Sequence, residues 1–127
     1  MFDHLSIGVT DLTRSAAFYD AVLATLGHVR LVDHVRAKCY GPKGFTGEPP
    51  FAILAPSDTA VVTHRFHLAF AATTREQVQA FHAAAIASGG TDDGPPGLRY
   101  DAPYYAAFVK DPDGHRLEAV LHEQPAR

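Results

Sequence analysis

The 127-residue sequence has one cysteine, no long apolar run and no cluster of basic residues. A single cysteine, Cys39, permits no internal disulfide bond, which favours a reducing compartment, so we expect a cytoplasmic protein. No stretch approaches the roughly 20 apolar residues that a membrane-spanning helix needs. The first residues also lack the basic-then-apolar order of a secretory signal. With a formal net charge of −3 and no local Lys/Arg run, the chain offers no surface for nucleic acid. Neither a membrane nor a nucleic acid is therefore expected as a partner.

The composition is that of a globular protein with a core. Hydrophobic residues make up 46% of the chain and charged residues 20%. The length is close to the commonest domain size, and we expect a single domain over residues 1–127.

An internal repeat divides this domain. Residues 4–28 align without a gap on residues 67–91, so that His4 coincides with His67. A phenylalanine, a glycine and the apolar positions coincide as well. In both copies a strand-like period of two changes to helical spacing at the same point. Duplication of a strand–helix unit accounts for this match.

Each copy predicts one helix after its first strand. The first helix is expected to begin at Asp11, a good N-cap residue, and to run to about Leu26. The second is expected to begin at Thr73, because Glu76 three residues later completes a capping-box pattern.

Short strands are expected after each helix. They lie near 29–33, 35–41 and 51–55 in the first half, and at YYAAFV and RLEAVL in the second. The sequence DPDG between the last two fits a type I turn, so these strands should pair as a hairpin. The Gly/Pro-rich stretch 89–103 is expected to be an irregular connection of the kind that often serves as a lid. The order strand–helix–strands, repeated once, predicts an α+β fold with a helix on one face of each sheet.

Three polar residues lie on the strand faces that point away from the helices. In each opening strand the bulky apolar residues alternate with a face made of the histidine, His4 or His67, and small residues, which leaves a hollow. Glu118 takes the corresponding face of RLEAVL. Two imidazoles and a carboxylate form the ligand set of facial-triad metal sites with open coordination positions. Taken singly, each residue also fits a structural or solvated position, because spacing alone does not bring the three together.

The chain resembles the vicinal oxygen chelate superfamily, which includes glyoxalase I, extradiol dioxygenases, fosfomycin-resistance enzymes and bleomycin-resistance proteins. The resemblance covers nearly the whole chain and rests on DHLSIGVTDLTRSAAFY, FHLAFAA and DPDGHRLEAV in that order. It implies two βαβββ modules, at about 1–57 and 64–123, that form a curved mixed sheet around a cup-shaped site. It also implies one divalent ion (Ni, Zn, Fe, Mn or Co) on His4, His67 and Glu118, and a homodimer. In some members each site takes ligands from both subunits.

The sequence departs from the better-known members in three ways. Glyoxalase I has a fourth ligand, a glutamate on the last strand of its first module, whereas Phe51 to Ala55 here contain no carboxylate. Extradiol dioxygenases have a tyrosine three residues before the Asp-Pro turn, where this chain has Phe108. No counterpart of the potassium-binding loop of fosfomycin-resistance enzymes is visible. Oxygen-dependent ring cleavage is therefore the less favoured reaction.

We expect a metal-dependent isomerase or lyase of the glyoxalase type, acting on a small molecule whose two adjacent oxygens chelate the ion. Glu118 would then transfer a proton together with a nearby tyrosine. Tyr104 and Tyr105 both stand beside Glu118, and only one can face the hollow. Strand alternation does not settle which, and Tyr105 is taken with Glu118 as the catalytic pair.

The alternative is a non-catalytic protein of the bleomycin-resistance type that sequesters a small molecule. Aromatic residues could line its cavity: Tyr40, Phe45, Phe51, Tyr100, Tyr104 and Tyr105. At strand positions aromatic residues are also common in the core. A third reading is a family member that binds nothing specific.

Overall fold

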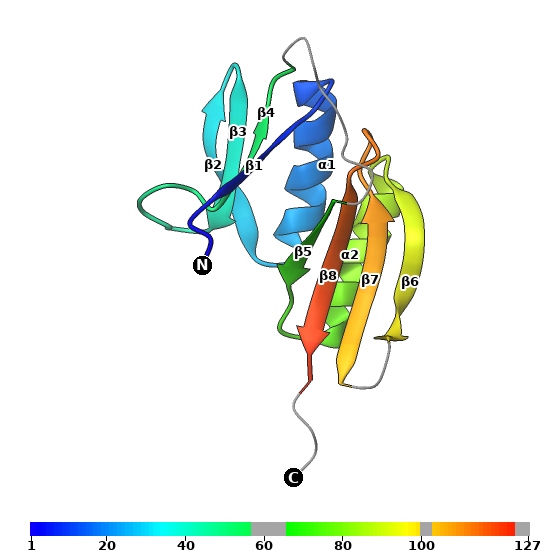
Figure 1. Ribbon diagram of the computed structural model, residues 1–127. Helices are drawn as coiled ribbons and strands as arrows, with labels where there is room; N and C mark the ends of the chain where they lie inside the picture. Colours follow the sequence, from blue (N-terminus) through cyan, green and yellow to red (C-terminus); the bar gives the residue numbers. More distant parts are fainter. Residues whose placement is uncertain (57–65, 100–102, 124–127) are drawn as a thin grey trace.

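The computed structural model describes residues 1–56, 66–99 and 103–123, which form two modules of the same topology (Figure 1). The first module contains β1 (Leu5–Gly8), α1 (Leu12–Ala24), β2 (His28–His34), β3 (Ala37–Pro42) and β4 (Phe51–Leu54). The second contains β5 (His67–Ala71), α2 (Arg75–Ala87), β6 (Thr91–Arg99), β7 (Tyr104–Lys110) and β8 (Arg116–His122). The expected α+β fold with two βαβββ modules is confirmed.

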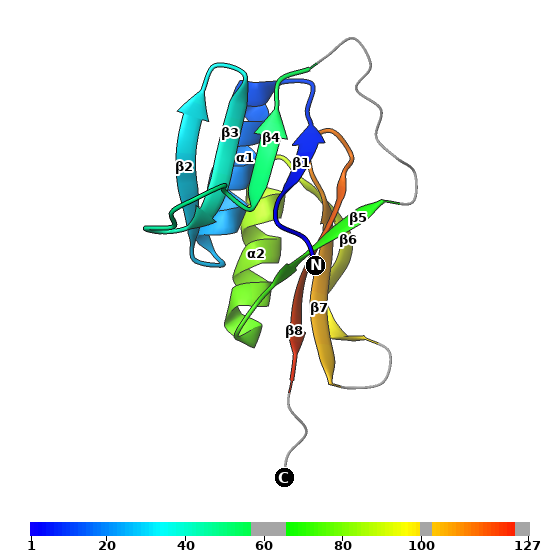
Figure 2. The same cartoon turned by 60° about the vertical axis from the view of Figure 1, so that its left-hand side comes forward.

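Each module has its own four-stranded mixed sheet. The strand orders are β1-β4-β3-β2 and β5-β8-β7-β6. In each sheet the first strand runs parallel to the last, as Figure 2 shows for β1 and β4, and the remaining pairs are antiparallel. Strands β1 and β5 are therefore edge strands, and within the described residues neither pairs with a second neighbour.

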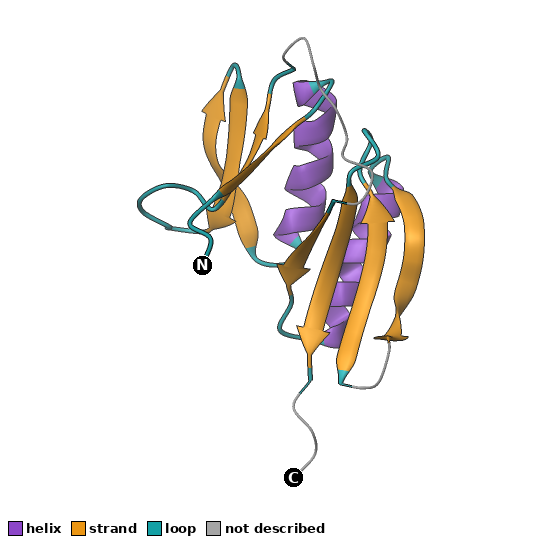
Figure 3. Cartoon of the chain, in the orientation of Figure 1, coloured by secondary structure: helices purple, strands orange, loops and turns teal. Residues whose placement is uncertain are grey.

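The helices cover one face of each sheet and contact each other (Figure 3). Alternate residues of the opening strands reach this core: Ile7 is buried on β1, whereas Ser6 and Gly8 on the opposite face are exposed. The core is continuous between the modules, because the ring of Phe51 on β4 packs edge-to-face on that of Phe70 on β5, with ring centres 5.4 Å apart. Neither helix has the length and apolar character needed to traverse a lipid bilayer.

The helix starts follow the expected capping chemistry, with one shift. The Asp11 side chain accepts a hydrogen bond from a backbone N–H three residues on, as predicted. The second helix begins one residue later than predicted, because Thr74 and not Thr73 is its N-cap. The Thr74 hydroxyl accepts from the backbone N–H of Gln77, and the Gln77 side chain accepts from the backbone N–H of Thr73. Either of the two adjacent threonines could act as the N-cap of α2, and the hydrogen bonds of Gln77 favour Thr74.

The prediction that residues 89–103 form an irregular lid-like connection is wrong, because Thr91–Arg99 is strand β6. Its pairing with β7 skips from Gly94 to Gly97, so the two prolines between them interrupt no continuous ladder. Strand β6 is also an edge strand, where proline is tolerated. Gly94 has φ 154°, and an added Cβ there would lie 3.0 Å from the Phe108 ring, so glycine lets β6 approach that side chain.

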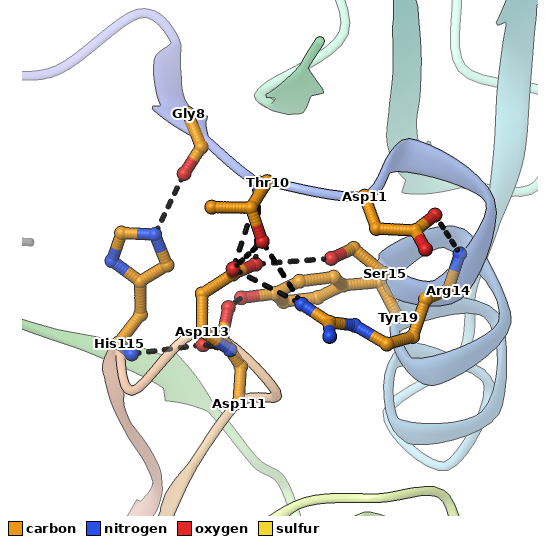
Figure 4. A network of polar contacts seen from close by, with 9 residues as sticks. All are labelled: Gly8, Thr10, Asp11, Arg14, Ser15, Tyr19, Asp111, Asp113 and His115. Atoms are coloured by element: carbon orange, nitrogen blue, oxygen red, sulfur yellow. Dashed lines mark hydrogen bonds and ion pairs between the residues drawn. The ribbon is translucent and has the colours of Figure 1, made fainter. Parts of the chain in front are cut away.

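The DPDG turn forms the predicted hairpin between β7 and β8, and its two aspartates contact the first module (Figure 4). The buried Asp111 carboxylate accepts a 2.7 Å hydrogen bond from the Tyr19 hydroxyl on α1. The same carboxylate accepts from the backbone N–H groups of Asp113 and His115. Burial raises the pKa of Asp111, and these hydrogen bonds oppose the rise.

The Asp113 carboxylate binds the start of α1 (Figure 4). It accepts from the backbone N–H of Thr10 at 3.3 Å and from the Thr10 hydroxyl, and it pairs with Arg14 at 3.1 Å. The His115 imidazole donates from Nε2 to the carbonyl oxygen of Gly8, at 2.7 Å. The turn that precedes β8 is thus fixed to the junction of β1 and α1.

Substitution of Tyr19 by Phe is expected to reduce the free energy of unfolding by about 1–3 kcal/mol, because it removes the Tyr19 hydroxyl that donates to Oδ2 of the buried Asp111, while the backbone donors to Oδ1 remain. Tyr40→Phe is the matched control, since the Tyr40 hydroxyl donates to Asp20, which is exposed. Chemical denaturation of both variants measures the difference. An equal or larger loss in Tyr40→Phe would show that the Tyr19–Asp111 contact contributes no more than the Tyr40 hydroxyl does through Asp20 and the carbonyl oxygen of Ala16.

Candidate metal and catalytic site

Glu118 is a buried carboxyl group on the sheet face that points away from α2. Its neighbours Leu117 and Ala119 belong to the core, so alternation directs Glu118 to the opposite face of β8. The side chain is only 2% exposed. Its Oε2 accepts a hydrogen bond from the Tyr104 hydroxyl, and its Oε1 lies 3.5 Å from Nε2 of His67. A buried carboxylate requires such polar partners, because desolvation without them is costly.

The distance between His67 and Glu118 fits two ligands of one metal ion. His67 opens β5, and its side chain is 57% exposed. Nitrogen and oxygen ligands about 2.0–2.2 Å from a divalent ion lie roughly 3–3.5 Å apart in octahedral or tetrahedral geometry. The separation of 3.5 Å falls at the upper end of this range and is long for a direct hydrogen bond. These two side chains could therefore hold an ion between them.

His4 does not join this pair within the chain. It precedes β1 in the other module, and its Nδ1 hydrogen-bonds to Oδ1 of Asp3 at 2.7 Å. This hydrogen bond raises the pKa of His4. Among residues 1–56, 66–99 and 103–123, no three His, Cys, Asp or Glu side chains cluster closely enough to ligate one metal. The chain brings together two of the three expected ligands.

Of the two adjacent tyrosines, Tyr104 and not Tyr105 lies beside Glu118. Tyr105 faces α2, where its hydroxyl accepts a hydrogen bond from Gln79 and the Arg75 guanidinium lies 4.5 Å from its ring centre. Tyr104 faces the candidate site and donates to Glu118. The hairpin register explains this placement: Phe108 lies opposite Glu118, and Tyr104, four residues earlier, shares that face.

A cavity of about 200 Å³ contains the pair. Its lining combines charged and aromatic side chains: His67, Asp93, Tyr104, Phe108, Arg116 and Glu118. Sequence analysis did not identify Asp93, Phe108 or Arg116 as part of the site. Arg116 and Phe108 were recognisable in principle, since both share the face of Glu118 once the hairpin register is known.

Most of the aromatic residues proposed for a ligand cavity lie elsewhere. Tyr40, Phe51 and Tyr105 belong to the core, and Tyr40 and Phe51 also line a second, apolar cavity. Phe45 is exposed, and Tyr100 lies outside the described residues. Only Tyr104 of this group lines the cavity beside Glu118.

A second cavity, of about 230 Å³, lies between the modules and is apolar. Leu5, Leu23, Leu68 and Phe70 contribute to its walls. Its titratable side chains are Tyr40 and His28; burial lowers the pKa of His28, and the Nδ1 atom has no hydrogen-bond partner among the described residues. Without a carboxylate this cavity lacks the acid–base pair found around Glu118, so the candidate site is the smaller cavity.

The model of the Glyoxalase/Bleomycin resistance protein/Dioxygenase superfamily matches residues 1–119. The chain belongs to this superfamily. A glyoxalase/bleomycin resistance protein from Albidiferax ferrireducens has a similar structure, with 40% identity, a TM-score of 0.82, and coverage of 94% of this chain and 97% of that one. No curated protein matches the sequence.

Two further solved structures are more distant in sequence. A putative glyoxalase from Bacillus halodurans is 27% identical, with a TM-score of 0.72 and coverage of 94% of both chains. A fosfomycin resistance protein from Mesorhizobium loti is 20% identical, with a TM-score of 0.68 and coverage of 97% of this chain and 92% of that one. At 20% identity, the likeness to the fosfomycin resistance protein shows a shared fold.

Replacement of Glu118 by Gln is expected to stabilise the chelator-treated protein by about 1 kcal/mol, because it keeps the acceptor for Tyr104 and removes a buried carboxylate. Glu123→Gln is the control: Glu123 is a more exposed carboxylate that pairs with Arg75 at 2.6 Å, and its loss should cost no more than about 1 kcal/mol. Urea denaturation in the presence of a chelator measures both. A Glu118→Gln protein less stable than wild type would mean that Glu118 is a structural residue.

Proposed function

We propose that the protein is a metal-dependent enzyme of the glyoxalase type, an isomerase or lyase that acts on a small molecule with two adjacent oxygen atoms. The observation that carries this proposal is the buried Glu118 carboxyl group, which has a tyrosine hydroxyl on one oxygen and an imidazole 3.5 Å from the other. A ligand-binding protein without chemistry has no need to bury a carboxylate beside two titratable groups. The names of similar structures, which include a glyoxalase-related enzyme, agree with this class.

His67 and Glu118 would hold a divalent ion, and His4 of a second copy of the chain would be the third ligand. The hydrogen bond from Nδ1 of His4 to Asp3 supports this assignment, because metal-binding histidines commonly direct their other ring nitrogen at a carboxylate. The unpaired edges of β1 and β5 also support it. Strand β1 comes directly after His4, and β5 begins with His67. Each has one neighbouring strand among the described residues, so its outer edge offers backbone groups to a partner strand. A homodimer that brings β1 of one copy to β5 of the other would complete the site.

A bound divalent ion supplies Lewis-acid polarisation of a substrate carbonyl or enolate oxygen. The Tyr104 hydroxyl donates a hydrogen bond to Oε2 of Glu118 and so holds the carboxylate in place. Glu118 is the proposed proton acceptor, and Tyr104 takes the role first assigned to Tyr105. The Phe108 ring, opposite Glu118 on β7, forms an apolar wall that limits water beside the carboxylate.

Wild-type protein is expected to bind one Ni²⁺ or Zn²⁺ per chain by titration calorimetry, and His67→Ala and His4→Ala to lose most of this binding. His82→Ala is a matched control, because His82 also pairs with an aspartate, Asp92 at 2.8 Å, but belongs to α2. The same affinity loss in His82→Ala would indicate non-specific histidine binding. Wild-type protein that takes up no ion would reject the metal site and leave sequestration of a small molecule as the function.

Mixing two inactive variants tests whether the site is shared. His4→Ala and Glu118→Gln should each lack metal binding, whereas their refolded mixture should recover about one quarter of the wild-type sites, because half of the random dimers each contain one intact site. No recovery in the mixture, with each variant still dimeric by light scattering, would rule out a site assembled from two chains.

A further inference from the structure

Three basic side chains stand in a row across the second sheet, next to Glu118. In the parallel pair β5–β8, His67 lies opposite Arg116, and in the antiparallel pair β7–β8, Arg116 lies opposite Lys110. Arg116 is two residues before Glu118 and shares its face of the sheet. The row His67–Arg116–Lys110 therefore runs along one side of the candidate site.

The Arg116–Lys110 pair is unfavourable for an isolated sheet, because like charges directly opposite each other destabilise a strand pair. Four cations of the described residues have carboxylate partners: Arg14 pairs with Asp113, Arg30 with Asp20, Lys38 with Asp33, and Arg75 with Glu123. Arg116 differs from the unpaired, exposed Arg36 and Lys43 because it lines the candidate site. Over the ranges 1–56, 66–99 and 103–123, neither Arg116 nor Lys110 has an ion pair or a side-chain hydrogen bond, although both are described. Asp93 lines the same cavity as Arg116 and forms no ion pair with it.

We infer that Arg116 and Lys110 bind an oxyanion, a carboxylate, phosphonate or phosphate group of the substrate. Arg116 lines the cavity of about 200 Å³ that contains His67 and Glu118. Its planar guanidinium can donate two parallel hydrogen bonds to such a group, and Lys110 adds a second positive charge beside it.

The strand spacing narrows the substrate class. Neighbouring strands lie about 4.8 Å apart, so Arg116 is one such step from His67. Because Arg116, His67 and Glu118 line the same cavity of about 200 Å³, an anionic group on Arg116 and oxygen atoms directed at His67 and Glu118 can belong to one small molecule. The identification of the bound anion as a substrate rests on the proposed function. The anion site itself does not depend on a metal. The class is a small acid that carries its anionic group next to a hydroxyl or carbonyl oxygen.

The test is thermal denaturation of protein stripped with a chelator and dialysed, in phosphate, methylphosphonate, acetate or chloride at equal ionic strength. Phosphate or methylphosphonate is expected to raise the melting temperature of wild type above that in chloride, and acetate shows whether a carboxylate suffices. Arg116→Gln and Lys110→Gln are each expected to weaken the anion affinity roughly tenfold. In chloride alone, both variants should melt about 1–3 °C higher than wild type, because the repulsion is relieved.

Arg36→Gln and Lys43→Gln are matched controls, since both residues are exposed, lie in the first module and form no ion pair with any described residue. They should respond to anions as wild type does. Equal melting temperatures of wild type in all four salts, or the same anion affinity in Arg116→Gln as in Arg36→Gln, would overturn the inference. Because no metal is present, this result is independent of the calorimetric test of the metal site, and either proposal can fail alone.

Discussion

The hydrogen bonds of the Asp111–Asp113 turn hold the two modules in one arrangement. Asp111 is buried against the Tyr19 hydroxyl, and Asp113 accepts from the backbone at Thr10, where β1 passes into α1. Burial makes this contact specific, because a buried carboxylate that lost its donors would be strongly disfavoured. Strand β8 begins two residues after the turn, with Arg116. The start of the strand that carries Glu118 is thus fixed to the first module.

The duplicated modules have unequal chemistry. In the second sheet Ala69 of β5 lies opposite Glu118, and in the first sheet the equivalent residue Ser6 lies opposite Ala52. Alanine therefore occupies the position in the first module that a carboxylate occupies in the second. The first module can contribute His4, but no carboxylate stands at its position equivalent to Glu118. Duplication produced two similar sheets, and among the described residues only the second carries the buried Glu118 with Tyr104 and the adjacent cations.

Local patterns in the sequence predicted most of the fold. A period of two placed His67 and Glu118 on the faces away from the helices, and the DPDG turn predicted the last hairpin correctly. Strand β6 was missed because prolines and glycines usually indicate a loop, and only the edge position with its skipped pairing makes them acceptable.

The site was harder to predict than the fold, because it depends on contacts between distant parts of the chain. Tyr104 could be distinguished from Tyr105 only through the register of the hairpin, which sequence alternation alone does not fix. The role of Arg116 depends on its neighbours in two other strands, which no local pattern reports. His4 carries the appropriate sequence signal, yet its proposed partners belong to another copy of the chain.

Gly8 shares the strand face of His4, and this position has a consequence for evolution. It does not require glycine: its φ is not positive, and an added Cβ would meet no atom within 4 Å. The hydrogen bond from His115 goes to the backbone carbonyl oxygen of Gly8, which a side chain at this position would leave in place. A lineage could therefore acquire alanine, serine or a larger residue here without loss of the fold. If this face lines a shared cup, paralogues could diverge in the ligands they admit while the residues that perform the chemistry stay unchanged.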